Sequence, residues 1–146
     1  MATRYVAFKF TTSLNHYNQG GFVEPHDFSH MRAAIRETLE EAGINVAIKG
    51  ILRVEHSMYH SRARQRVIFY AEPKDPLQTP KRTPDKESLK AEWLTLEELK
   101  EKSRKPPPEG LRGPELLDWA TYLENGGQVY PLELLVTEDT PIPKPK

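Results

Sequence analysis

Residues 29–43 constrain the fold more than any other stretch, because they carry a helical pattern that ends at a defined residue. Apolar side chains and one threonine recur there at helical spacing, namely Met31, Ala34, Ile35, Thr38 and Ala42. This spacing is typical of an amphipathic helix with one buried face. Gly43 follows directly, and glycine is the usual residue where a helix ends in left-handed backbone. The sequence therefore predicts a helix over residues 29–42.

Four other stretches favour β-strands. Residues 5–11 place Val6, Phe8 and Phe10 at every second position, which is the period of a strand. Residues 46–56 and 64–71 are rich in Val, Ile, Phe and Tyr, and a polar segment, residues 60–64, separates them. We expect a hairpin there, with residues 60–64 as its connection. Residues 91–94 are long enough for one further short strand.

Two shorter helices are expected in the second half of the chain. Thr95 and Glu98 have the spacing of a capping box, which predicts a helix up to about Lys102. A last helix, ending at residues 125–127, is indicated by a stripe formed by Leu116, Trp119, Ala120 and Leu123. Residues 136–146 are rich in proline. The order of strands and helices predicts one α/β domain over residues 1–135, followed by a proline-rich tail over 136–146.

Composition excludes several classes of function. The chain has 146 residues, 21 basic and 21 acidic side chains and no cysteine. A balanced charge does not favour bulk nucleic acid or an anionic membrane, and without cysteine there is neither a thiolate metal site nor a cysteine nucleophile. No run of 18 apolar residues is present, so the expected location is cytoplasmic.

The expected helix over residues 29–42 also carries a group of acids. Glu37, Glu40 and Glu41 are three and four residues apart, so their carboxylates lie on one face of a helix. Like charges at this spacing repel one another, and carboxylate oxygens select hard cations such as Mg²⁺ or Mn²⁺. The alternative is an ordinary solvated face, since most charge runs have no chemistry.

The segment before the helix favours the metal site over the solvated face. Gly20-Gly-Phe-Val-Glu-Pro25 followed by Arg36-Glu-Thr-Leu-Glu-Glu-Ala-Gly-Ile44 resembles the Nudix box, G-x5-E-x7-R-E-U-x-E-E-x-G-U, where U is a bulky aliphatic residue. The second half of the box matches at every fixed position, with Thr38 in place of the first aliphatic residue. The first half departs, because Asp27 stands where the box has glutamate and lies one residue further from Arg36.

The resemblance to Nudix hydrolases implies a fold, an activity and a set of site residues. The implied fold is an α/β/α sandwich with a mixed β-sheet, here with a shortened amino-terminal strand region, because only 19 residues precede Gly20. The implied activity is Mg²⁺- or Mn²⁺-dependent hydrolysis of the pyrophosphate bond in a nucleoside diphosphate linked to another group. The motif does not specify that group. The expected protein is a monomer or homodimer with a nucleotide-type small-molecule substrate.

The same resemblance assigns roles residue by residue. Glu37, Glu40 and Glu41 resemble the metal-binding and base-activating acids, and Gly21 resembles the glycine whose carbonyl approaches the metal. Arg36 resembles an arginine that braces the glycine loop by pairing with an acid, for which Asp27 is the expected partner. A catalytically weak or inactive module that binds a nucleotide or a protein is the alternative, suggested by the altered glycine loop.

Residues outside the box are weaker candidates. Arg62, Arg64 and Arg66 alternate, so a strand would present all three on one side, either to phosphates or, as we favour, to solvent. In some Nudix relatives a later acid acts as base or metal ligand, and the resemblance offers Glu87 or Glu92 for that role; the equally favoured alternative is an acid placed by chance in a charged loop. The histidine pairs His26/His30 and His56/His60 do not favour a zinc site over substrate contact or plain surface. Both tryptophans are expected in the core.

Overall fold

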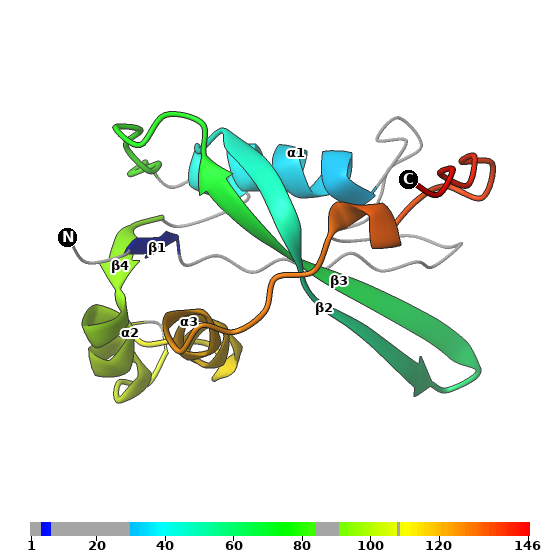
Figure 1. Ribbon diagram of the computed structural model, residues 1–146. Coiled ribbons are helices and arrows are strands. Elements are labelled where there is room, and N and C mark those ends of the chain that lie inside the picture. The colour runs from blue at the N-terminus through cyan, green and yellow to red at the C-terminus, as the bar shows by residue number, and fades with distance from the viewer. Residues whose placement is uncertain (1–3, 7–29, 84–90, 108) are drawn as a thin grey trace.

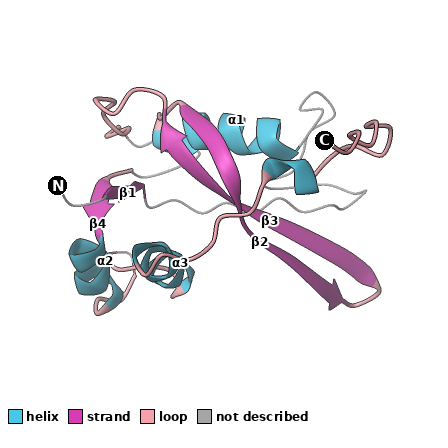
Figure 2. Cartoon of the chain, in the orientation of Figure 1, coloured by secondary structure: helices cyan, strands magenta, loops and turns pink. Residues whose placement is uncertain are grey.

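The computed structural model describes residues 4–6, 30–83, 91–107 and 109–146, and the side chains of residues 4–6, 59 and 62 lie outside this description. Figures 1 and 2 show the elements in chain order, which are β1 (Arg4–Val6), α1 (His30–Ala42), β2 (Val46–Tyr59), β3 (Arg62–Pro73), β4 (Trp93–Thr95), α2 (Leu96–Ser103), α3 (Glu115–Glu124) and the 3₁₀ turn η1 (Leu132–Leu134). The strands and helices confirm an α/β fold.

The described strands form two antiparallel pairs. β1 pairs with β4, and β2 pairs with β3. Figure 1 shows α1 beside the end of the β2–β3 hairpin that is farther from its turn, with α2 and α3 near the β1–β4 pair. No mixed sheet occurs among the described strands, so the α/β/α sandwich stays a prediction. Of the strand expected over residues 5–11, residues 7–11 lie outside the description, and the shortening of this region stays a prediction as well.

The β2–β3 hairpin has a tighter turn than the sequence suggests. The ladder runs to Tyr59 opposite Arg62, so the expected connection over residues 60–64 is wrong and only His60 and Ser61 form the turn. Both have left-handed backbone, with φ of 48° and 41°. Two such residues match the twist of the flanking strands, because this geometry belongs to the favoured two-residue hairpin turn. The polar residues 62–64 pair through their backbone.

Helix α1 has the expected face and the expected end. Its buried residues are Ala33, Ala34, Thr38 and Ala42. The hydroxyl of Thr38 is satisfied inside this face, since it donates a hydrogen bond to the carbonyl oxygen of Ala34 at 2.7 Å. Gly43 has φ of +70°, and its amide donates to the carbonyl oxygen of Leu39 at 2.9 Å. The prediction of a helix stopped by glycine is confirmed.

Two clusters of buried side chains form part of the core that the structure describes, and Ile51, Val67 and Ile68 of the hairpin are buried outside both clusters. The first joins α1 to β2 and contains Ala42, Ile44, Val46 and Ala91, with Trp93 packed against it. The second joins β4, α2 and α3 and contains Leu94, Leu99 and Ala120. Adjacent residues of a strand point to opposite faces, and β4 accordingly gives Trp93 to one cluster and Leu94 to the other. Trp93 is a core residue, as expected, and its Nε1 donates to the carbonyl oxygen of Gln78 at 3.0 Å.

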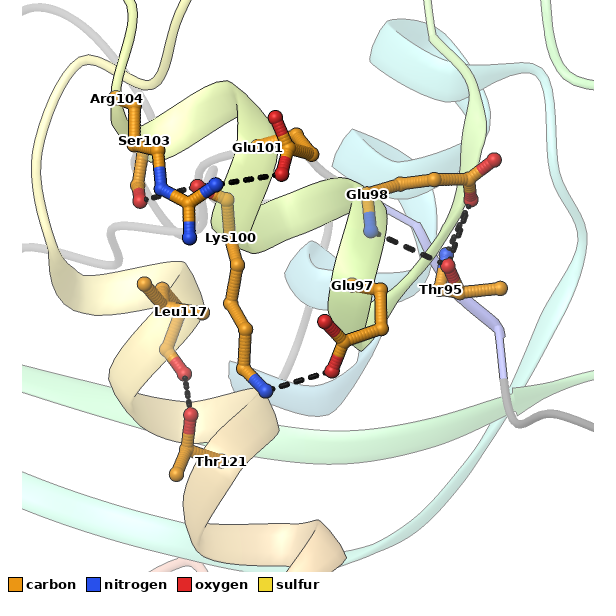
Figure 3. A network of polar contacts seen from close by, with 9 residues as sticks. All are labelled: Thr95, Glu97, Glu98, Lys100, Glu101, Ser103, Arg104, Leu117 and Thr121. Carbon is orange, nitrogen blue, oxygen red and sulfur yellow. Dashed lines mark hydrogen bonds and ion pairs between the residues drawn. The ribbon is translucent and has the colours of Figure 1, made fainter.

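Helix α2 begins with the capping box that the sequence predicts. Figure 3 shows the reciprocal bonds, in which the Glu98 amide donates to Thr95 Oγ1 at 3.3 Å and the Thr95 amide donates to Glu98 Oε2 at 2.7 Å. These bonds satisfy two amides that the helix itself leaves without partners. The helix ends at Ser103, one residue beyond the expected end.

The carboxy-terminal segment crosses β2. Ile51 and Tyr130 exchange two backbone hydrogen bonds of 2.9 and 2.8 Å. Residues 136–146 are exposed and contain neither helix nor strand.

Among the described helices, none is both long enough and apolar enough to cross a membrane.

Candidate active site on helix α1

The four functional candidates of α1 lie outside its buried face. Arg36 and Glu37 are partly covered, with side-chain exposures of 21% and 17%, and Glu40 is more open at 45%. Glu41 is partly buried. Because the buried alanines fix which way the helix faces, the positions of these charged side chains follow from packing of the opposite side.

Arg36 lies between two of the acids. Its Nη1 is 2.9 Å from Glu37 Oε1 and 3.0 Å from Glu40 Oε2. A single positively charged nitrogen therefore contacts both carboxylates. This contact offsets the repulsion between two acids spaced three residues apart. It also shows that the two carboxylates approach one position where a cation is held.

The pairing of Arg36 with Asp27 that the resemblance suggests stays a prediction. The arginine does pair with acids, but the described partners belong to its own helix. The expected partner Asp27 and the loop glycine Gly21 lie outside the described residues. The pair between Arg36 and Glu40 has the i, i+4 spacing of a helical ion pair, so the spacing alone was a sufficient signal for it.

The donor set has the right chemistry for a hard divalent cation. Glu37, Glu40 and Glu41 offer carboxylate oxygens, which Mg²⁺ and Mn²⁺ prefer. Within residues 30–83, 91–107 and 109–146, however, no group of three or more His, Asp or Glu side chains is gathered closely enough to hold a metal. Mg²⁺ usually takes only one or two protein carboxylates and completes its shell with water and substrate phosphate. The acids fit such an open site and do not form a closed cage.

Lys81 contacts the carboxy-terminal end of α1, and the sequence analysis did not single it out. Its Nζ donates to the carbonyl oxygen of Glu40 at 2.8 Å, and its backbone amide donates to the carbonyl oxygen of Ala42 at 2.8 Å. Cations and donors are favourable at this end of a helix, where the last carbonyls lack partners inside the helix. The proline-rich segment around Lys81 is thereby held against the acidic helix.

The remaining candidates lie outside α1, except His30, which is its first residue. Glu92 forms an ion pair with Lys102 at 2.5 Å, and Glu87 lies outside the described residues, as does His26. Burial lowers the pKa of His30 below its ordinary value of 6.5, because desolvation disfavours the charged imidazolium. His56 and His60 are both exposed, near and at the hairpin turn.

The arginines of β3 have different surroundings. Arg66 is buried, so a solvated face is wrong for this residue. Its guanidinium reaches Glu55 on β2 and Glu115 on α3, at 3.0 and 2.7 Å. Arg64 is partly buried, and together with Arg66 it lines a hollow on the β2–β3 hairpin. The side chain of Arg62 lies outside the description. Sequence alternation placed these residues on one face but did not indicate which would be covered.

Comparison with known proteins identifies the class to which this fold and this acidic helix belong. The family model of the NUDIX domain matches residues 6–119, which is more than half of the chain. The chain belongs to the Nudix family. Membership makes it a hydrolase of the Nudix type, a family of pyrophosphohydrolases with nucleotide-type small-molecule substrates that generally use divalent metals. No curated protein matches the chain.

Proposed function

We propose that this protein hydrolyses the pyrophosphate bond of a nucleoside diphosphate linked to another group, with Mg²⁺ or Mn²⁺ as its cofactor. Family membership supports the reaction class. The observation that carries the proposal for this chain is the contact of one Arg36 nitrogen with both Glu37 and Glu40, because two carboxylates already gather around a positive charge. The alternative of an inactive binding module rests on the altered glycine loop of the sequence alone, and no contact among the described residues adds support to it.

In this proposal Glu37, Glu40 and Glu41 hold the ion, together with the carbonyl of Gly21. A bound divalent ion neutralises phosphate charge and lowers the pKa of water. One of the three glutamates accepts a proton from the attacking water, whose oxygen bonds to one phosphorus atom while the bridging oxygen leaves with the other phosphate. Arg36 positions Glu37 and Glu40. The complete domain would have the α/β/α sandwich of the family. We propose that the protein acts in the cytoplasm.

A substrate panel tests the activity directly. Nucleoside triphosphates, oxidised nucleotides, ADP-ribose, dinucleoside polyphosphates and sugar nucleotides would be incubated with the full chain, with Mg²⁺ or with chelator. We expect hydrolysis of at least one compound in Mg²⁺ and none in chelator. No hydrolysis of any compound with either Mg²⁺ or Mn²⁺ would contradict the proposal.

Glu37→Gln tests the assignment of the acids. The substitution keeps the shape of the side chain and removes the charge that ligates the metal, so we expect kcat to fall about a hundredfold. The free energy of unfolding should change by less than about 1 kcal/mol, because the Arg36 pair is partly solvated and Glu40 remains. Glu97→Gln is the matched control, because this glutamate is exposed on α2, and the variant should keep full activity. Equal kcat for the two variants would remove Glu37 from the site.

A further inference from the structure

The β2–β3 hairpin carries a hollow that the acids of α1 do not line. It has a volume of about 440 Å³ and is lined by residues 53–57 of β2 and by Arg64 and Arg66 of β3. This volume falls within the range of small-molecule pockets, which is roughly 300–1,000 Å³. Of its lining residues only Val54 is apolar.

Most of the charge in this hollow is already paired. Glu55 binds two arginines, with Oε1 at 3.2 Å from Arg53 Nε and Oε2 at 3.0 Å from Arg66 Nε. Arg66 has a second carboxylate, since its Nη2 lies 2.7 Å from Glu115 Oε1. The carboxylates of Glu55 and Glu115 thus pair with Arg53 and Arg66. The third arginine of the hollow, Arg64, pairs with neither carboxylate.

The side chain of Arg64 has no ionic or hydrogen-bonding partner in the part of the chain that the structure describes. Its Nε is buried from solvent and makes no hydrogen bond. Burying such a donor without a partner costs free energy, and most buried polar groups of native proteins have a partner, either in the protein or in an ordered water. Ser57 lies directly opposite Arg64 in the ladder, and directly opposite side chains share one face of an antiparallel pair. The hydroxyl of Ser57 is exposed and makes no described hydrogen bond either.

The chemistry of the hollow indicates the class of ligand. A guanidinium fork matches the oxygens of a phosphate, and a hydroxyl adds one more donor. Among the lining residues the imidazole of His56 is the one ring, and Trp119 lies under Arg66, whose guanidinium carbon is 5.7 Å from the ring centre. Three of the seven lining residues are arginines, so the hollow favours an anionic group, and a phosphate with a hydroxylated carrier matches the guanidinium and the hydroxyl.

We propose that Arg64 and Ser57 form a phosphate-binding site on the β2–β3 hairpin, distinct from the metal-binding acids of α1. The site takes a phosphomonoester, either a phosphate group carried by the substrate or a free phosphorylated sugar. This inference goes beyond the proposed hydrolysis, because it requires neither metal nor turnover.

Titration calorimetry with inorganic phosphate and with ribose 5-phosphate tests the site on the full chain, in chelator. We expect saturable binding, tighter for ribose 5-phosphate, and a loss of affinity of about tenfold in Arg64→Gln, since hydrogen bonds to a charged group are the strong ones. Arg104→Gln is the matched control, because it removes one positive charge from an exposed pair on α2. Its affinity should equal that of the unmodified protein.

Three further measurements complete the test. Circular dichroism checks that Arg64→Gln folds, and Ser57→Ala, which should weaken binding by a smaller factor, replaces it if it does not. Competition by ribose 5-phosphate against hydrolysis of the best substrate would assign the site to a phosphate of the substrate, and unaffected hydrolysis would assign it to a free sugar phosphate. Absence of saturable binding, or equal affinity in Arg64→Gln and Arg104→Gln, would overturn the proposal.

Discussion

Arg66 shows how one buried charge ties separate elements together. Its guanidinium contacts Glu55 on β2 and Glu115 on α3 and lies over the ring of Trp119. Both carboxylates keep access to water, with side-chain exposures of 33% and 48%. The acids therefore contribute without heavy desolvation costs, and the arginine supplies packing as well as charge.

We expect Arg66→Ala to destabilise the protein by about 1–2 kcal/mol, because it removes two ion pairs and leaves space beside Trp119. The partial exposure of Glu55 and Glu115 keeps the loss below that of a fully buried pair. Urea unfolding followed by tryptophan fluorescence and circular dichroism gives the measurement. Arg53→Ala is the control, since Arg53 binds the same Glu55 from a side chain that is 65% exposed, and it should cost less than about 0.5 kcal/mol. Equal costs for the two variants would show that Arg66 acts as an ordinary surface ion pair.

At the scale of the element, patterns that depend on neighbours in sequence were predictable. The helix α1, its glycine end and the capping box of α2 follow from spacings of a few residues, and the structure has all three. The burial of Arg66 depends on α3, because its guanidinium binds Glu115 of that helix. Glu115 lies 49 residues further along the chain. The two-residue hairpin turn was missed because His60 and Ser61 are not the residues that usually mark left-handed backbone.

In the candidate site, too, features that depend on nearby residues were predictable and contacts between distant residues were not. The sequence placed Glu37, Glu40 and Glu41 on one face of a helix, because helical geometry alone determines this. It did not indicate Lys81, whose contact with Glu40 links positions 41 residues apart. Nor did it show that Arg64 remains without a partner while Arg66 has two, since that difference depends on which strand and helix surround each side chain.

The capping box of α2 leads to a prediction for an element. Thr95→Ala removes the hydroxyl that accepts the Glu98 amide and leaves Glu98 as the remaining half of the box (Figure 3). We expect the free energy of unfolding to fall by about 1 kcal/mol. Thermal and urea unfolding of the purified variant provide the measurement. Thr137→Ala, in the exposed carboxy-terminal segment, serves as control and should leave the midpoint unchanged. A Thr95→Ala midpoint equal to that of the control would mean that the cap does not contribute to stability.

At the scale of the whole molecule and among the described residues, the adjacent Trp93 and Leu94 of β4 join the two buried clusters, and Arg66 adds the link from the hairpin to α3. A further link is made where the carboxy-terminal segment pairs with β2 through Ile51 and Tyr130. Small clusters provide limited hydrophobic stabilisation, so we expect these links to have a large share in holding the elements in place.

Gly50 permits the last of these links and provides its test. A Cβ atom at this position would collide with the Val129 side chain and lie 2.8 Å from the carbonyl oxygen of Tyr130. That oxygen accepts the amide of Ile51, so Gly50→Ala should push the carboxy-terminal segment off β2 and cost about 1–3 kcal/mol. Hydrogen exchange at the Ile51 and Tyr130 amides should become faster, and the urea midpoint should fall. Gly113→Ala is the control, because a Cβ there would meet nothing within 4 Å. Unchanged exchange at both amides in Gly50→Ala would show that the segment tolerates the added methyl group and that its pairing with β2 does not depend on this close approach.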